Sequence, residues 1–135
     1  MTTLRNGVND GDAGLKLREK GTGNLVAQIV KPVSSNNAIA GILIREDAAG
    51  NLQATVENAI ANGNADDGIS FDENSSGNLA GDVLRATASG NGGAGVAAEQ
   101  ATTGTGLLRI RDLTATGNTD GAVRNDAGAT VQFLN

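Results

Sequence analysis

The chain has 135 residues, with ten basic against fifteen acidic side chains and a formal net charge of −5. It contains no Cys or His, and Phe71 and Phe133 are its only aromatic residues. This composition excludes a disulfide framework, a thiolate metal site and the common nucleophile–base pairs of catalysis. The acidic balance predicts no nucleic-acid partner, because phosphate binding requires clustered Lys and Arg.

Membrane insertion is not expected, since the chain has no window of about 18 apolar residues. The N-terminal sequence MTTLRNGVND also lacks the apolar core of a signal peptide. With so few aromatic residues, a core must be filled by rows of Val, Ile, Leu and Ala. A regular stack of strands supplies such rows more readily than an irregular globule does.

One sequence period organises the whole chain, because two glycine columns and one asparagine column recur every 27 positions. The columns are Gly14, Gly41, Gly68 and Gly95; Gly23, Gly50, Gly77 and Gly104; and Asn37, Asn64, Asn91 and Asn118, which Asp10 precedes. The length of the chain equals five such periods. We therefore predict one domain, residues 1–135, made of five coils without insertion or deletion.

Apolar residues mark the strands of each coil, taken here in chain order. The first strand carries the columns Leu15, Ile42, Ile69, Val96, Val123 and Leu17, Ile44, Phe71, Ala98. The second carries Leu25, Leu52, Leu79, Gly106, Phe133; then Ala27, Ala54, Gly81, Leu108; then Ile29, Val56, Val83, Ile110. A third, shorter apolar patch comprises Val33, Ile60 and Ala59, Ala86, Leu113. Steps of two residues along each strand place alternate side chains on one face.

Three short strands per coil, repeated in register, predict an all-β fold, a right-handed parallel β-helix of five coils. Each strand would pair with its equivalent one coil away at about 4.8 Å, so that five coils stand on the order of 24 Å high. The right hand follows from the preference of parallel strand connections. A leucine-rich repeat overlaps in period, but it requires more Leu per repeat and a helical or turn-rich outer side.

The asparagine column resembles the stacked ladder of right-handed β-helix proteins, in which side-chain amides one coil apart bond each other and the turn backbone. The glycine four residues later, as in GNADDGISF (63–71) and GNGGAGVAA (90–98), lets the chain turn tightly into the next strand. All five coils resemble the pectate-lyase-like superfamily and, more closely, the Gly- and Asn-rich repeats of bacterial surface and secreted β-helix proteins. The resemblance implies an extracellular or cell-surface location but no single activity, since this scaffold carries lyases, hydrolases, adhesins and phage spikes.

One dense acidic group flanks the strand that begins at Gly68: Asp66, Asp67, Asp72 and Glu73. These carboxylates are candidate ligands for Ca²⁺, which takes six to eight oxygen atoms. No other cofactor is expected. We favour the simpler interpretation of a solvated charged face, because outward positions of a solenoid are normally charged.

The alignment places Asp72 beside Arg45 and Glu99, which makes these three residues a candidate binding ladder. Enzymes of the superfamily that this chain resembles use paired carboxylates in an outer groove, so Asp72 and Glu99 are formally a glycosidase-type pair. We nevertheless predict no catalytic residues, because an unbroken repeat has no inserted loop to build a cleft. The outer face also lacks an aromatic platform for a sugar ring.

The predicted function is therefore a non-catalytic structural or binding module. The alternatives are a carbohydrate-active or polysaccharide-binding module and a calcium-binding module. The terminal segments TTLRNGV and ATVQFLN are expected to lie in register, with Val131 and Phe133 in strand positions and no amphipathic cap. We expect such ends to stack on a second copy, giving head-to-tail filaments, or on flanking parts of a longer chain.

Overall fold

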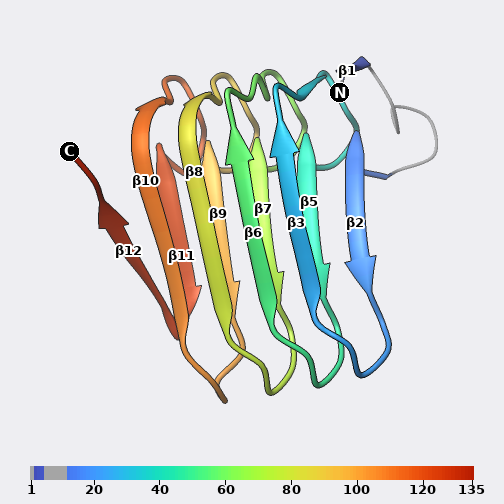
Figure 1. Cartoon of the computed structure of the whole chain (residues 1–135). Coiled ribbons are helices and arrows are strands. Elements are labelled where there is room, and N and C mark those ends of the chain that lie inside the picture. Colours follow the sequence, from blue (N-terminus) through green and yellow to red (C-terminus); the bar gives the residue numbers. More distant parts are fainter. Residues whose placement is uncertain (1, 5–11) are drawn as a thin grey trace.

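The structure, a computed structural model, describes all atoms of residues 12–126 and 128–135 and the backbone of residues 2–4 and 127. These residues form strands and turns and contain no helix (Figure 1). The strands are β1 (Thr2–Leu4), β2 (Leu15–Glu19), β3 (Leu25–Val30), β4 (Val33–Ser35), β5 (Ile42–Glu46), β6 (Leu52–Glu57), β7 (Ile69–Glu73), β8 (Leu79–Thr87), β9 (Val96–Gln100), β10 (Gly106–Thr114), β11 (Val123–Ala127) and β12 (Ala129–Phe133).

Two parallel sheets of five strands make up most of the fold, in the orders β11-β9-β7-β5-β2 and β12-β10-β8-β6-β3. The chain alternates between them, so Leu15 pairs with Ile42 and Leu25 with Leu52, one sequence period further along in each case. In Figure 1 the two sheets lie one behind the other with their strands running in opposite directions. This confirms the predicted all-β parallel solenoid with a 27-residue spacing, and the described strands make about four turns.

The core lies between the two sheets and consists of the predicted apolar columns. Ile69 pairs with Ile42 on one side and Val96 on the other, and all three are fully buried. Phe71, also fully buried, takes space that the facing sheet leaves free at Gly81, where a Cβ would lie 3.1 Å from the Phe71 ring. Burying aliphatic side chains in this way contributes about 1.5 to 3 kcal/mol each.

The predicted third strand is a separate element only as β4, which pairs with β1. In the next coil Ile60 alone forms isolated bridges, to Val33 and Thr87. Later coils absorb this segment into the ends of the long strands β8 and β10, where Leu113 pairs with Ala86. The third face is therefore narrower than the two main sheets.

A left-handed residue marks the same corner in four coils. Lys31, Asn58, Arg85 and Asp112 occupy equivalent positions of the repeat and have φ angles of 55°, 54°, 54° and 57°. Residues other than glycine rarely adopt this conformation. Its recurrence at one position indicates that the stack itself imposes the bend between the second and third faces.

The register of the last coil differs from the prediction. Ala129 pairs with Gly106 and Phe133 with Ile110, so the offset between partners is 23 positions (129 − 106). An unbroken repeat would have placed Phe133 opposite Gly106. Val131 and Phe133 do occupy strand positions, but the final coil is four residues shorter.

The reason is steric and lies in the turn between the two sheets. Earlier coils pass this turn through stacked glycines, and a Cβ on Gly77 would lie 1.6 Å from the carbonyl oxygen of Gly50. The residue 27 positions after the last of these glycines, Gly104, is Val131. Its side chain does not fit this turn, and the chain instead crosses between the sheets at Gly128, directly after β11.

The first coil also departs from the predicted register. Thr2 pairs with Val33, an offset of 31 positions (33 − 2), whereas the regular step would have brought Asn6 there. The segment at the expected step, 6–8, contains Gly7, whereas Thr2–Leu4 has residues that favour extended backbone. Asp10, which precedes the asparagine column, lies outside the described residues.

Candidate functional site

The asparagine column lies in the turns that lead from the second sheet back to the first. The backbone N–H of Asn64 donates to Asn91 Oδ1 at 2.9 Å, and its Nδ2 donates to the same atom at 3.0 Å. Asn91 makes the same two bonds to Asn118, both at 2.9 Å, and Asn37 makes them to Asn64. The Oδ1 atoms of Asn64, Asn91 and Asn118 are each engaged twice by the preceding coil, so these bonds stabilise the turns. Asn37 Oδ1, at the start of the described column, has no hydrogen-bond partner among the described residues.

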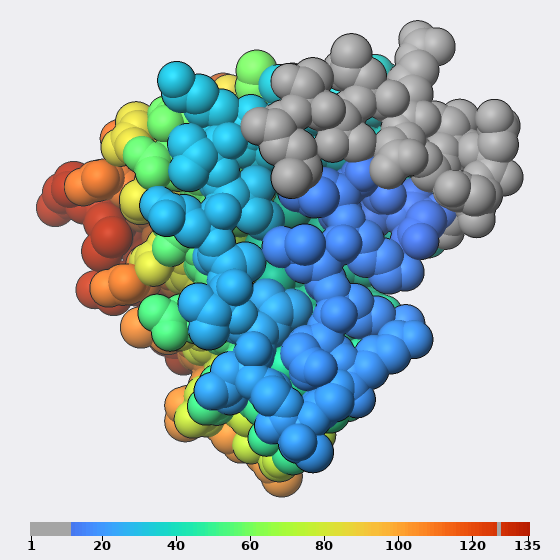
Figure 2. Space-filling model, turned by 45° about the vertical axis from the view of Figure 1, so that its right-hand side comes forward, coloured from blue at the N-terminus to red at the C-terminus, as the bar shows by residue number. Residues whose placement is uncertain are grey.

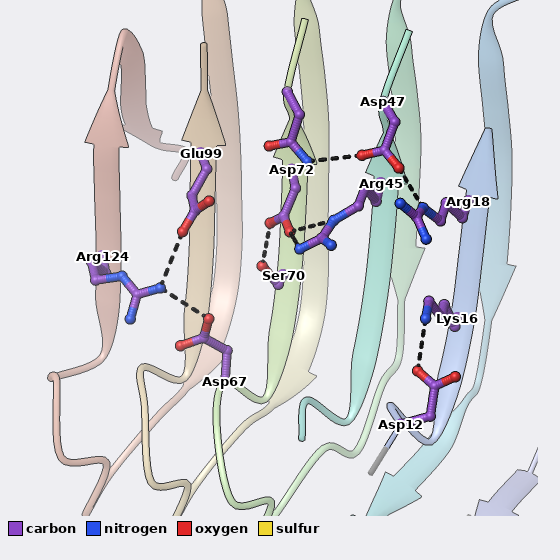
Figure 3. A network of polar contacts seen from close by, with 11 residues as sticks. Asp12, Lys16, Arg18, Arg45, Asp47, Asp67, Ser70, Asp72, Glu99 and Arg124 are labelled. Carbon is purple, nitrogen blue, oxygen red and sulfur yellow. Dashed lines mark hydrogen bonds and ion pairs between the residues drawn. The ribbon is translucent and has the colours of Figure 1, made fainter. Parts of the chain in front are cut away.

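Charged and polar side chains cross the outer face of the sheet that contains β7 (Figure 3). Asp72 is the most buried of the predicted binding residues there, at 3% exposed. Its Oδ2 accepts hydrogen bonds from Arg45 Nη2 at 2.7 Å and Nε at 3.1 Å, and its Oδ1 accepts one from Ser70 Oγ at 2.6 Å. Both oxygens of this carboxylate are therefore engaged within the chain.

A second group on this face surrounds Arg124 of β11, a residue that the sequence pattern did not single out. Its guanidinium pairs with four carboxylates: Asp67 at 3.1 Å, Glu99 at 3.6 Å, Asp120 at 3.1 Å and Asp126 at 2.9 Å. Asp67 is 57 residues earlier, and Arg124 reaches it from β11 across the small side chain of Ala97. The sequence period aligns only residues in the same column, so this contact had no signal in the sequence.

The outer column on this sheet has a polarity along the solenoid. It reads Arg18, Arg45, Asp72, Glu99 and Asp126 from β2 to β11. Arg18 also pairs with Asp47, whose other oxygen accepts a hydrogen bond from Asn74 Nδ2 at 3.0 Å. The column is thus positive at the β2 end and negative at the β11 end.

The four predicted calcium ligands do not converge. Asp66 is exposed, Asp67 is paired with Arg124, and Asp72 is held by Arg45. Glu73, which the prediction grouped with them, points into the core, because alternate residues of a strand face opposite sides. Within the described part of the chain, no group of three or more Asp, Glu, His or Cys side chains is placed to hold a metal ion.

The formal catalytic pair, Asp72 and Glu99, does lie side by side on β7 and β9. Burial raises the pKa of Glu99, the charge of Asp72 adds to this, and Arg124 opposes it. A raised pKa suits a general acid, but Asp72 is already occupied by Arg45 and Ser70. Two hollows lie elsewhere, at the end formed by β2 and β3.

A buried polar column, which the predictions missed, runs inside the same sheet. It consists of Glu19, Glu46, Glu73 and Gln100. Glu46 and Glu73 are fully buried, and each Oε1 accepts a hydrogen bond at 3.0 Å from the backbone N–H two residues later. Their Oε2 atoms have no hydrogen-bond partner. The signal was available, because these residues continue the inward alternation of Leu17, Ile44 and Phe71 by one step of two.

Gln100 shows how an amide at this position satisfies its hydrogen-bonding groups. Its Nε2 donates to the carbonyl oxygen of Gly77 at 2.9 Å, and its Oε1 accepts from the Leu79 N–H at 2.9 Å. Glu73 lacks the donor group, and burial raises its pKa, with the charge of Glu46 adding to the shift. The Ser75 N–H, which donates to Glu73 Oε1, lowers that pKa. The Gly77 N–H lowers it too, although it makes no hydrogen bond of normal geometry with the Glu73 carboxylate.

The β2–β3 end of the solenoid carries a hollow of about 530 Å³ (Figure 2). It is lined by Leu15, Leu17, Val26, Ala27, Gln28, Ile29 and Val30. Leu15 and Leu17 are only half-buried, whereas their equivalents one coil later, Ile42 and Ile44, are fully buried. The core columns of Leu15, Leu17 and Ala27 are therefore partly accessible at this end, whereas Leu25 and Ile29 of β3 are buried.

No family model, curated protein or solved structure matches the chain. Its parallel β-solenoid agrees with the β-helix architecture that the repeats resemble. The described residues also include no helix long and apolar enough to cross a bilayer.

Proposed function

We propose that this chain is a non-catalytic structural β-helix module, a rigid spacer that is extended at its ends by further β-coils. The observation that supports this most strongly is the apolar hollow of about 530 Å³ at the β2–β3 end. Accessible apolar surface of this kind marks interaction sites in soluble proteins. Strands at the edge of a sheet also accept further strands through their backbone groups.

The arrangement of the outer face favours this role over a catalytic one. The carboxylates that would have to act on a substrate, Asp72 and Glu99, are engaged by Arg45, Ser70 and Arg124. The resemblance to the pectate-lyase-like superfamily accordingly concerns the scaffold, and we do not extend it to catalysis. A secreted or cell-surface location, as in the bacterial repeats that this chain resembles, is part of the proposal.

A tandem fusion of two full chains, with Asn135 followed by Met1 of the second copy, tests whether the ends accept a further coil. We expect one cooperative thermal transition, several degrees above that of the single chain, because the junction buries apolar surface from both copies. Calorimetry at equal mass concentration measures this. A tandem that melts at the temperature of the single chain, as two independent units, would contradict the proposal.

Phe133 provides a matched control, because it is 67% exposed on the last strand. Phe133→Asp in the first copy places a charge at the junction and should remove the gain in melting temperature. The same substitution in the second copy lies at a free end and should leave the gain in place. Equal effects from the two positions would show that the gain does not come from the junction.

A further inference from the structure

The two ends of the solenoid match each other strand by strand. Among the described residues, the two five-stranded sheets end at β2 and β3 on one side and at β11 and β12 on the other. We propose that the β11–β12 end of one molecule docks on the β2–β3 end of a second copy of this chain, so that both sheets continue across the junction. This rests on the proposed structural function and specifies its partner and register.

The inward side chains of β12 and β3 are complementary in size. Phe133 continues the core column of Ile110, yet it is 67% exposed because no later coil covers it. In a continued sheet the inward pairs would be Ala129 with Leu25, Val131 with Ala27 and Phe133 with Ile29. Two of these pairs place a small side chain opposite a larger one, and Phe133 would enter the hollow that Ala27 and Ile29 help to line.

The charged column sets the direction of stacking. Continuing the other sheet places Asp126 opposite Arg18 of the second copy, the arrangement that Arg45 and Asp72 make within one molecule at 2.7 Å. Two copies joined by their β2 ends would instead bring together the outward cations of both copies, Lys16 and Arg18. An exposed ion pair contributes little affinity, so this pair selects the head-to-tail direction while the apolar contacts hold the junction.

The polar residue Asn125 is a member of the core columns on β11, and in this register it would face the apolar Leu17. Its Nδ2 donates to the carbonyl oxygen of Ala129 at 3.0 Å within its own chain. This donor is therefore already satisfied. Position 127 would lie opposite Glu19, the half-buried first member of the polar column. Because the two surfaces are different and lie on opposite ends, their repeated pairing gives an open filament and not a closed dimer.

Engineered disulfides test the register. In the proposed junction Gln132 lies opposite Gln28 of the second copy, both on the outer face. Paired strands about 4.8 Å apart fall within the range that a disulfide bridges. Within one molecule the two residues lie on the first and last strands of a five-stranded sheet, about 19 Å apart at that spacing, which excludes an internal bond. The described residues contain no cysteine to interfere.

We expect the double variant Gln28→Cys, Gln132→Cys to form a ladder of covalent oligomers on mild oxidation, seen on non-reducing gels. A mixture of the two single variants should give cross-linked dimers. The control is Gln28→Cys with Thr130→Cys, whose Cα atoms would lie about 8 Å apart across the junction, beyond disulfide reach. Its yield should be at least tenfold lower.

Sedimentation of the unmodified full chain across concentration gives an independent measurement. We expect oligomers that Phe133→Asp reduces to monomers, while Leu107→Asp, a change on the outer face of β10, leaves their size unchanged. Monomers at all concentrations without a covalent ladder, or equal cross-linking in the Thr130 control, would overturn the proposal. If the tandem fusion still melts as one unit in that case, the structural function stands and only the second copy as partner fails.

Discussion

Glu46 and Glu73 lie side by side in the interior of the solenoid, one coil apart, and neither is exposed to solvent. Each carboxylate has one oxygen bound to a turn N–H and one oxygen without a hydrogen-bond partner. The same column ends in Gln100, whose amide is satisfied on both sides. The column therefore provides its own comparison between a buried acid and a buried amide.

Replacing Glu73 with Gln should stabilise the fold at pH 8, by about 1 to 3 kcal/mol, the cost of an unsatisfied buried polar group. The new amide can make the bonds that Gln100 makes one coil later, to the Gly50 carbonyl and the Leu52 N–H. Urea unfolding at pH 8 measures this. Glu19→Gln is the control, since Glu19 is only half-buried and its oxygens accept from the Gly21 N–H. A loss of stability in Glu73→Gln would contradict the placement of this side chain.

The same carboxyl predicts how stability depends on pH. Because burial raises the pKa of Glu73, the folded state retains a proton that the unfolded state releases near pH 4.3. The favourable contribution is complete below that unfolded value and is lost as pH rises through the folded pKa. We expect Glu73→Gln to flatten this decline. Parallel pH–stability curves for the parent and the variant would refute the assignment.

Asn64→Ala should destabilise the fold by about 1 to 3 kcal/mol, because it removes the acceptor of two Asn37 donors and leaves buried groups unpaired. Asn78→Ala is the matched control. Asn78 also accepts a backbone hydrogen bond from the following coil, from the Thr105 N–H, but it is exposed, so water can replace it. Thermal melts of the two variants should differ. Equal losses would show that burial of the ladder is unimportant.

Ile69→Asp should prevent folding, because it buries an unpaired charge between Ile42 and Val96. Ile69→Val, which introduces the residue found one coil later, should cost only about 0.5 to 1.5 kcal/mol. Circular dichroism with heating distinguishes the two outcomes. A cooperative melt of the Asp variant near the parent temperature would rule out this register.

Calcium should raise the melting temperature little or not at all, since the four acidic residues predicted as ligands do not converge. Melts with and without millimolar Ca²⁺ test this, with Mg²⁺ as the control ion. A rise of several degrees with Ca²⁺ alone, lost when Asp66, Asp67 and Asp72 are replaced together, would establish a calcium site instead.

Much of this architecture could be predicted from periodicity alone. Identical spacing of apolar residues forces equivalent strands into register, so the contacts of Ile42, Ile69 and Val96 follow from the repeat step. The same step predicts the pairing of Arg45 with Asp72. The period-two alternation of β7 also predicts that Glu73 points inward. The charge of Glu73 favoured the interpretation that it lies on the outer face. Burial of that carboxylate is tolerated because the Ser75 N–H binds one of its oxygens.

The sequence by itself therefore determined the repeat, the strand faces and the asparagine ladder, since each depends on contacts between equivalent positions. Only the tertiary structure decided where the repeat is interrupted and which contacts join non-equivalent positions. The last coil is shorter because Val131 does not fit the turn between the two sheets. In that turn the backbones of successive coils lie so close that a Cβ atom would overlap the neighbouring carbonyl group. Arg124 reaches Asp67 because side-chain length and the small Ala97 between them, not sequence spacing, bring the two charges together.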